Sequence, residues 1–185
     1  TGARRTGKTT LARVHYPDLR YVNLDDPQNR ERVRAISSAA WGRDIGAAIL
    51  DEAQKEPVVF EKVKYAYDAG QVTFQCLLGS SQILLLKRIR ESLAGRASVY
   101  ELWPLMMSEL YGPAGATRAA APLLDQVVEG RPLGRVLARE PSVLLEEDDE
   151  PRKQAQRHLL RWGGMPALLP IDEEERWKWL KDYEY

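Results

Sequence analysis

The chain has 185 residues, enough for one domain with a sizeable core or for a domain and a small second one. Its 27 basic side chains equal its 27 acidic ones, so net charge gives no sign of a nucleic-acid partner, and a single cysteine excludes a disulfide framework. No apolar run is long enough for a membrane-spanning helix, so we expect a cytoplasmic protein without a membrane partner.

The first segment is rich in glycine: residues 2–9 read Gly-Ala-Arg-Arg-Thr-Gly-Lys-Thr and match G-x-x-x-x-G-K-S/T in full. Glycines let such a loop turn so that successive N–H groups hold phosphate oxygens, and the helix expected at residues 7–14 favours anions at its N-terminus. Lys8 is then predicted to reach the β- and γ-phosphates and Thr9 to ligate Mg²⁺. The alternative is an ordinary turn with a solvated lysine. The predicted nucleotide-binding residues are Gly2, Ala3, Arg4, Arg5, Thr6, Gly7, Lys8, Thr9 and Thr10.

The next elements predict the start of an α/β domain with a largely parallel sheet. Residues 21–24 form a short strand, and a helix follows over residues 26–36, with Asp26 as its N-cap and Pro27 in its first turn. Residues 47–50 are small and apolar, which is typical of a buried strand.

Two acids, Asp51 and Glu52, come directly after the strand at residues 47–50. Parallel strands carry ligand sites at their carboxyl ends, so both acids should face the phosphate loop. We predict that Asp51 holds Mg²⁺, directly or through water, and that Glu52 polarises the water that attacks the γ-phosphate. The alternative is a strand-ending turn whose acids face solvent.

The α/β pattern continues to residue 103. Helical spacing is found at residues 57–69 and 81–94, and strands are expected at residues 72–78 and 98–102. Ser80, at the end of the strand at residues 72–78, is a candidate sensor that contacts the γ-phosphate or the attacking water. Ser80 and the neighbouring Ser81 are equally good helix N-caps, and the two roles are compatible.

The pattern changes after residue 103, because no strand-like run follows. Helices are expected near residues 105–110, 123–129, 133–139 and 152–162, with loops at residues 112–122 and 146–150. We therefore expect a small helical domain over residues 104–170. Residues 171–185 should begin a helix that stops without a cap, and a further strand is expected ahead of Thr1, so we expect the chain to be part of a longer protein.

Seven stretches of the chain, in this order, resemble one family. They are residues 1–11, 22–27 (VNLDDP), 49–56 (ILDEAQKE), 77–86, 91–96 (ESLAGR), 101–110 and 160–169 (LLRWGGMPALL). These stretches resemble the bacterial and archaeal AAA+ ATPases that carry an additional C-terminal domain of unknown function. The resemblance covers nearly the whole chain and is far more specific than the phosphate loop alone.

The resemblance implies a P-loop NTPase fold of the AAA+ type: a nucleotide-binding α/β core at residues 1–103 with a five-stranded sheet, and a helical lid at residues 104–170. It implies ATP and Mg²⁺ as cofactors, and Lys8, Thr9 and the acids at 51 and 52 as the phosphate, metal and water ligands. It also implies that nucleotide state is coupled to DNA or a protein through the C-terminal domain.

Arg96 lies where related ATPases place an arginine finger, which reaches the γ-phosphate of a neighbouring subunit in a homo-oligomer. The alternative is an arginine that satisfies carbonyls at the end of its own helix. Arg161, in the stretch that resembles the lid motif, is a weaker candidate for a second sensor. Leu78 departs from the family, which commonly has threonine there, so that Ser80 has to supply the sensing hydroxyl.

Three functions follow from these patterns. The first is an ATPase that hydrolyses ATP to ADP and phosphate, with Lys8, Glu52, Ser80 and Arg96 as the catalytic set. The second is a nucleotide-gated binding module with little turnover, which the departure at Leu78 favours weakly. The third is a small-molecule kinase, against which the acid pair and the lid motif argue.

Overall fold

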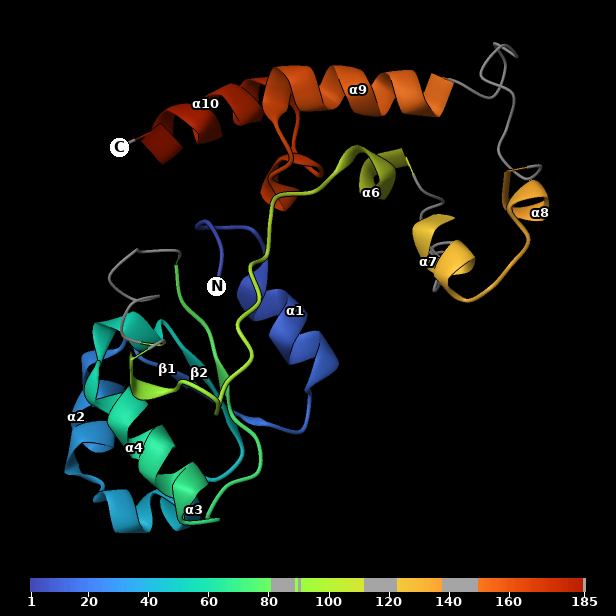
Figure 1. Cartoon of the computed structure of the whole chain (residues 1–185). Coiled ribbons are helices and arrows are strands. Elements are labelled where there is room, and N and C mark those ends of the chain that lie inside the picture. The colour runs from blue at the N-terminus through green and yellow to red at the C-terminus, as the bar shows by residue number, and fades with distance from the viewer. Residues whose placement is uncertain (81–88, 90, 112–122, 138–149, 185) are drawn as a thin grey trace. The chain divides into compact units, whose positions relative to one another are not determined.

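The computed structural model describes residues 1–80, 89, 91–111, 123–137 and 150–184. The chain divides into two compact units, Thr1–Trp103 and Pro104–Tyr185 (Figure 1). The first unit contains the sheet, and the second consists of helices and their connections.

A parallel sheet forms the centre of the first unit. Its strands β1 (Arg20–Asn23), β2 (Ala48–Asp51) and β3 (Cys76–Leu77) lie in that order, with Asn23 opposite Asp51 in the register. Parallel neighbours need crossover connections, and the helices between these strands supply them. The predicted α/β P-loop fold is confirmed, although the described residues form three hydrogen-bonded strands where the resemblance implied five.

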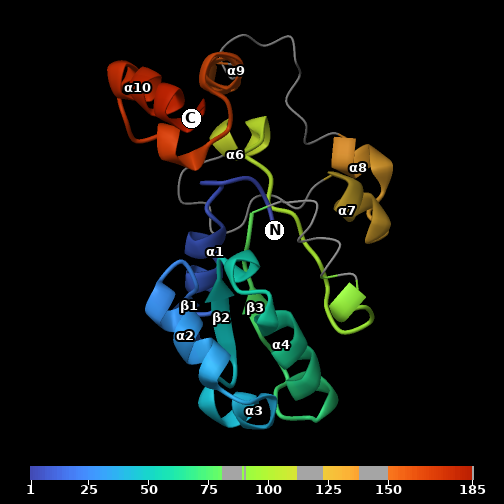
Figure 2. The same ribbon diagram turned by 90° about the vertical axis from the view of Figure 1, so that its left-hand side faces the viewer.

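Helices cover both faces of this sheet (Figures 1 and 2). Helix α1 (Lys8–His15) lies on one face, while α2 (Pro27–Ala35), α3 (Trp41–Asp44) and α4 (Val58–Asp68) lie on the other. Because successive strand side chains alternate, Ile49 packs with Ala12 of α1, and its neighbour Leu50 joins the larger cluster with the other helices. Strand β2 is therefore buried on both faces, as its apolar sequence predicted.

The start of α2 follows the sequence prediction. Asp26 has an extended backbone and its Oδ1 accepts a hydrogen bond of 2.8 Å from the Gln28 amide, with Pro27 in the first turn. Sequence analysis assigned no element to residues 37–46, where the structure has a 3₁₀ turn (Ser38–Ala40) and α3. The fully buried side chain of Trp41 anchors this segment in the core.

The strand expected at residues 72–78 is shorter in the structure, where only Cys76 and Leu77 pair with β2. The segment before it is fixed by side-chain amides instead of a strand ladder. Gln71 Oε1 accepts from the Gly42 amide at 3.1 Å, and Gln75 Oε1 accepts from Trp41 Nε1 at 3.2 Å. Such bonds do not impose strand geometry.

The strand expected at residues 98–102 is reduced to a single parallel bridge between Gly2 and Leu102. The Leu102 amide donates to the Thr1 carbonyl at 2.8 Å, so the segment pairs beside the phosphate loop over a very short length. Most of the helix expected at residues 81–94, including Ser81, lies outside the described residues, but residues 89, 91 and 92 are helical and Leu93 is buried in the core.

The described part of the second unit consists of helices and short connections. Its elements are α6 (Met107–Tyr111), α7 (Leu123–Val128), α8 (Leu133–Leu137), α9 (Glu150–Trp162), a 3₁₀ turn (Pro166–Leu168) and α10 (Glu173–Glu184). The structure groups residues 171–185 with this unit, and the rings of Trp162 and Trp177 meet edge to face at 5.2 Å. The loops expected at residues 112–122 and 146–150 lie outside the described residues, apart from Glu150, which is the first residue of α9. Within the part that is described, no helix is long and apolar enough to cross a membrane.

Candidate functional site

The loop ahead of α1 has the backbone conformation that its glycines predict. Gly2, Arg5 and Gly7 have φ angles of 147°, 60° and 91°, so two of the three positive angles fall on glycine. A Cβ at Gly2 would lie 2.3 Å from the Leu102 carbonyl oxygen, which excludes any side chain there. The buried Thr6 closes the turn, because its Oγ1 donates to the Ala3 carbonyl at 3.0 Å. Left-handed residues of this kind form the concave backbone that binds anions in other proteins.

Lys8 extends back across the loop. Its Nζ donates to the Gly2 carbonyl at 3.1 Å and to the Ala3 carbonyl at 2.5 Å. Burial lowers the pKa of the Lys8 ammonium, while the carboxylates of Glu52 and Asp51 oppose that shift. The charges of both acids therefore favour the protonated form of this lysine.

Asp51 joins the phosphate loop to the sheet. Its side chain is buried, and its Oδ2 accepts from Thr9 Oγ1 at 2.6 Å and from the Tyr21 hydroxyl at 2.9 Å. Its Oδ1 accepts from the Glu52 amide at 2.9 Å. The carboxylate of Asp51 is thus held by one group from α1, one from β1 and one from the backbone beyond β2.

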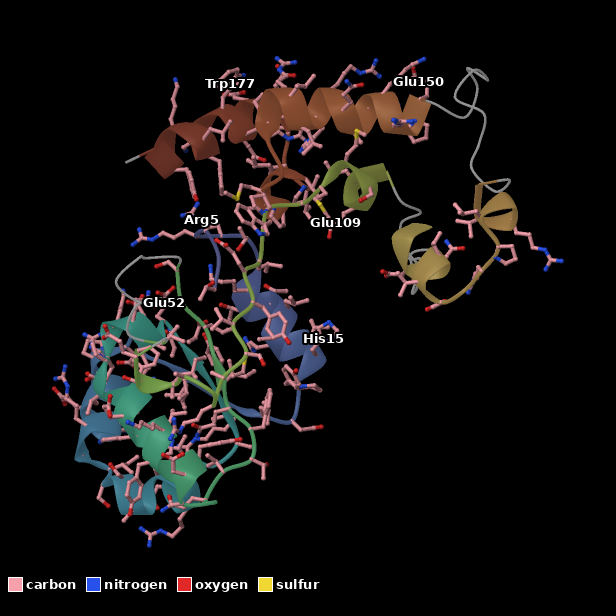
Figure 3. The ribbon with its side chains drawn as sticks, viewed as in Figure 1. Arg5, His15, Glu52, Glu109, Glu150 and Trp177 are labelled. Atoms are coloured by element: carbon pink, nitrogen blue, oxygen red, sulfur yellow. The ribbon has the colours of Figure 1, made fainter. Side chains whose placement is uncertain are left out.

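Glu52 lies at the carboxyl end of β2 (Figure 3), and its backbone conformation is strained. Its φ of 54° and ψ of 39° are left-handed, which is uncommon for a residue with a side chain. The Ala53 amide donates to the Leu78 carbonyl at 2.9 Å and fixes the chain just beyond it. Strained residues of this kind concentrate at functional sites.

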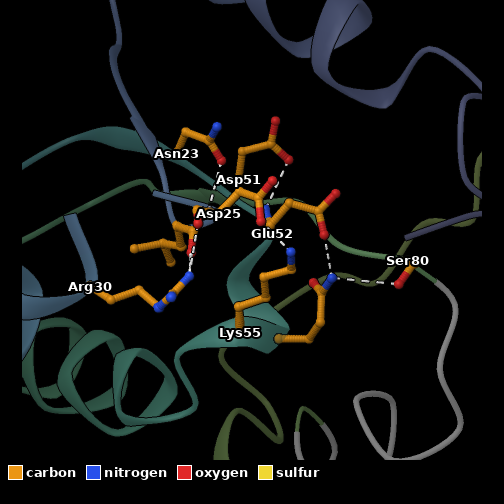
Figure 4. Close-up of polar contacts among 9 residues, drawn as sticks. Asn23, Asp25, Arg30, Asp51, Glu52, Lys55 and Ser80 are labelled. Atoms are coloured by element: carbon orange, nitrogen blue, oxygen red, sulfur yellow. Dashed lines mark hydrogen bonds and ion pairs between the residues drawn. The ribbon is translucent and has the colours of Figure 1, made fainter. Parts of the chain in front are cut away.

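Ser80 is linked to Glu52 through a third side chain (Figure 4). The Gln54 amide donates to Glu52 Oε2 and lies 3.5 Å from Ser80 Oγ, at the outer limit of a hydrogen bond. Ser80 is itself buried. The two predicted residues thus come together through one that sequence analysis did not select.

The remaining predicted residues differ in their surroundings. The side chains of Arg4, Arg5 and Thr10 are exposed. Arg96 Nε donates to Asp68 Oδ1 at 2.6 Å and its Nη1 donates to the Ala94 carbonyl at 3.1 Å, both within its own chain. The Ala94 carbonyl lies just beyond helical residues 91 and 92, whereas Asp68 is the last residue of α4, and the finger role of Arg96 stays a prediction.

Arg161, in the second unit, forms an ion pair with Glu173, and its guanidinium lies 4.8 Å from the ring centre of Trp162. His15 is exposed at the end of α1 (Figure 3). Cys76 is a half-buried residue of β3, and burial raises the pKa of its thiol.

The groups around Asp51 suit Mg²⁺, which prefers oxygen ligands and keeps several of its waters. Thr9 gives its only proton to Asp51, so the lone pairs of its oxygen stay open to a cation. In the residues that the structure describes, no cluster of three or more His, Cys, Asp or Glu side chains could hold a metal. A cation at Thr9 and Asp51 would therefore depend on water and phosphate oxygens for its other ligands.

Sequence reasoning missed two residues that contact the predicted acids, Tyr21 and Gln54. Tyr21 has a hydroxyl group and lies on a predicted strand, but its position in the sequence relative to Asp51 does not predict a contact between them. Burial raises the pKa of Tyr21 to about 12, and its hydrogen bond to Asp51 acts in the same direction. Gln54 follows Glu52 by two residues and lies within residues 49–56, one of the stretches that resemble the family. Its closeness to Glu52 in the sequence is the signal that could have identified it.

A family model described as an AAA domain matches residues 1–111, which is more than half of the 185 residues. The comparison with curated proteins gives no match, and neither does the comparison with solved structures. The matched range contains the loop, the sheet and the acids described above, so the resemblance to AAA-type ATPases is confirmed at this level. The additional C-terminal domain stays a prediction. We conclude that this chain belongs to the AAA domain family, whose members are nucleotide-binding, ATPase-like proteins.

Proposed function

We propose that this protein binds ATP together with Mg²⁺ and hydrolyses it to ADP and phosphate. The observation that carries the proposal is the hydrogen bond of 2.6 Å between Thr9 Oγ1 and Asp51 Oδ2. It joins the phosphate loop to the acidic end of β2, two patterns 42 positions apart in the sequence. An ordinary glycine-rich turn gives no reason for that contact.

Each group then has a distinct task. The loop amides and Lys8 bind the β- and γ-phosphates, and Thr9 and Asp51 hold Mg²⁺, which when bound neutralises charge on the phosphate oxygens. Glu52 takes a proton from a water molecule whose oxygen forms a bond to the γ-phosphorus. The bond from that phosphorus to the β-phosphate oxygen breaks, and ADP leaves.

Glu52 has the surroundings of a positioned base. Its carboxylate accepts a hydrogen bond from Gln54, whose amide also approaches Ser80. A contact of Ser80 with the γ-phosphate can therefore affect Glu52 through this amide. The family resemblance adds two predictions. Arg96 should act on the nucleotide of a neighbouring subunit, and nucleotide state should be coupled to DNA or a protein partner.

The Glu52→Gln variant tests the proposal. The amide keeps the size of the side chain but cannot accept the proton, so ATP should still bind with about the wild-type affinity while turnover falls by about 10²–10⁴. Binding is measured with a fluorescently labelled ATP in the presence of Mg²⁺, and turnover is measured as phosphate released with no acceptor added.

Lys8→Ala is the control for binding, because it removes the cation at the phosphates and should abolish nucleotide affinity. Equal phosphate release by the wild type and Glu52→Gln would show that Glu52 is not the base. Tight ATP binding by a wild type that releases no phosphate would contradict hydrolysis and support a nucleotide-gated module. Phosphate transfer to a metabolite, with none to water, would support a kinase.

A further inference from the structure

Tyr21 approaches the site from a strand that carries no part of the phosphate loop or the acid pair. In the register of β1 and β2 it lies opposite Ile49, two positions before the pair of Asn23 with Asp51. A tyrosine is long enough to cross this diagonal. Its hydroxyl donates to Asp51 Oδ2 at 2.9 Å.

The ring of Tyr21 contributes little to the core. The residue is 37% exposed, and its ring lies under the guanidinium of Arg13, 5.2 Å from the ring centre. Asp51, in contrast, is only 5% exposed. The apolar part of this side chain therefore remains near solvent while its single polar atom meets a buried carboxylate.

Asp51 has few remaining sites for a ligand. A carboxylate offers about four lone-pair directions, and three of them accept from Thr9, Tyr21 and the Glu52 amide. Two of these donors, Thr9 and Tyr21, bind the same oxygen, Oδ2. Thr9 is also a predicted Mg²⁺ ligand, whereas no role was predicted for Tyr21. Thr9 and Tyr21 hold Oδ2 from two different elements while the Glu52 amide holds Oδ1, so the hydroxyl of Tyr21 adds a second constraint on the oxygen that faces the phosphate loop.

We infer that Tyr21 is a positioning residue for the metal acid: its hydroxyl holds Asp51 in the orientation that binds Mg²⁺, directly or through water, when a nucleotide occupies the phosphate loop. This inference rests on the proposed function, and it adds a residue from β1 to the site. Outer groups that orient a metal-binding carboxylate typically contribute 10- to 100-fold to metal affinity.

The experiment compares the full chain with Tyr21→Phe, which removes one oxygen and keeps the ring. The fluorescence of a labelled ATP is followed while Mg²⁺ is titrated, and the Mg²⁺ concentration at half-maximal change is measured. We expect this concentration to rise at least tenfold in the variant. ATP affinity in the presence of a chelator should be unchanged, because the hydroxyl that this variant removes donates to Asp51 and the ring is kept.

Tyr16→Phe is the matched control, since Tyr16 is also exposed near α1 but its ring packs against Phe74 at 5.0 Å. It should titrate as the wild type does. A double variant, Tyr21→Phe with Asp51→Asn, should need no more Mg²⁺ than Asp51→Asn alone, because the hydroxyl acts through the carboxylate.

The outcomes separate this inference from the proposed function. If the wild type shows Mg²⁺-dependent tightening and Tyr21→Phe titrates at the same concentration, the inference is wrong and the proposed function stands. If the wild type binds no ATP with or without Mg²⁺, the proposed function is itself wrong. A thermal melt within about 2 °C of the wild type shows that a shifted titration is not due to unfolding.

Discussion

At the scale of single residues, Lys62 shows how one charged side chain can close a helix. The residue is only 6% exposed, and its Nζ donates to the carbonyls of Val33 at 2.6 Å, Arg34 at 2.9 Å and Ile36 at 2.5 Å. These carbonyls belong to the last turn of α2 and the residue after it, where no helical N–H is available. The ammonium of α4 therefore caps α2 and ties the two helices together.

Replacing this lysine should destabilise the first unit. Lys62→Met keeps most of the apolar length of the side chain but removes the donor of one buried and two partly buried hydrogen bonds, which costs about 3 kcal/mol. The loss is measured by urea denaturation followed by circular dichroism. Lys64→Met makes the same replacement two residues along α4, where the side chain is less buried, and should cost less than about 1 kcal/mol. Equal stability of the two variants would contradict the capping role.

At the scale of elements, residue spacing predicted the helices and strands whose tertiary surroundings favour the same structure as their local sequence. Strand β2 is apolar and buried on both faces, and α2 carries its own cap, so both were predicted closely. The segment at residues 72–75 has strand-like residues, but its path follows hydrogen bonds of Gln71 and Gln75 to α3 and to Gly46 just after it. Helix α3 was missed because four residues are too few for a periodic pattern.

In the second unit, Gly164 lets the end of α9 contact the segment before α6. The Leu105 amide donates to the Gly164 carbonyl at 2.7 Å, and a Cβ at Gly164 would lie 2.2 Å from the Leu105 carbonyl oxygen. A backbone atom has little room to move away, so Gly164→Ala should cost about 2 kcal/mol, which urea denaturation would measure.

Gly134→Ala is the matched control for this prediction. A Cβ at Gly134, inside α8, meets no atom within 4 Å, and alanine favours the helix by up to about 1 kcal/mol. This variant should be as stable as the wild type or slightly more so. If Gly164→Ala were also as stable as the wild type, the close approach to Leu105 would not be a constraint on the fold.

At the scale of the whole molecule, the apolar core is unevenly divided. Both core clusters consist of residues between Ala12 and Leu93, all within the first unit. In the described part of the second unit, the buried apolar side chains are those of Val136, Ala155, Trp162 and Leu168. Since burial of apolar surface is the main favourable term in folding, the two units should differ in stability.

Hydrogen exchange should report this difference. Amides of β2 and α4 should exchange through global opening, while those of α9 and α10 should exchange at least tenfold faster through local opening. Mass spectrometry of peptides from the intact chain measures both sets in one experiment. Equal protection of α4 and α9 would show that the units open together.

The sequence by itself determined the parts of the site that are local patterns: a loop over residues 2–9, an acid pair after a buried strand, and an α/β order that brings strand ends to one edge. Only the tertiary structure decided that Tyr21 reaches Asp51 and that Gln54 joins Glu52 to Ser80. The physical reason is that such contacts depend on strand register and on the path of the loop beyond β2. Both are fixed by packing across the sheet, and neither can be predicted from the spacing of residues along the chain.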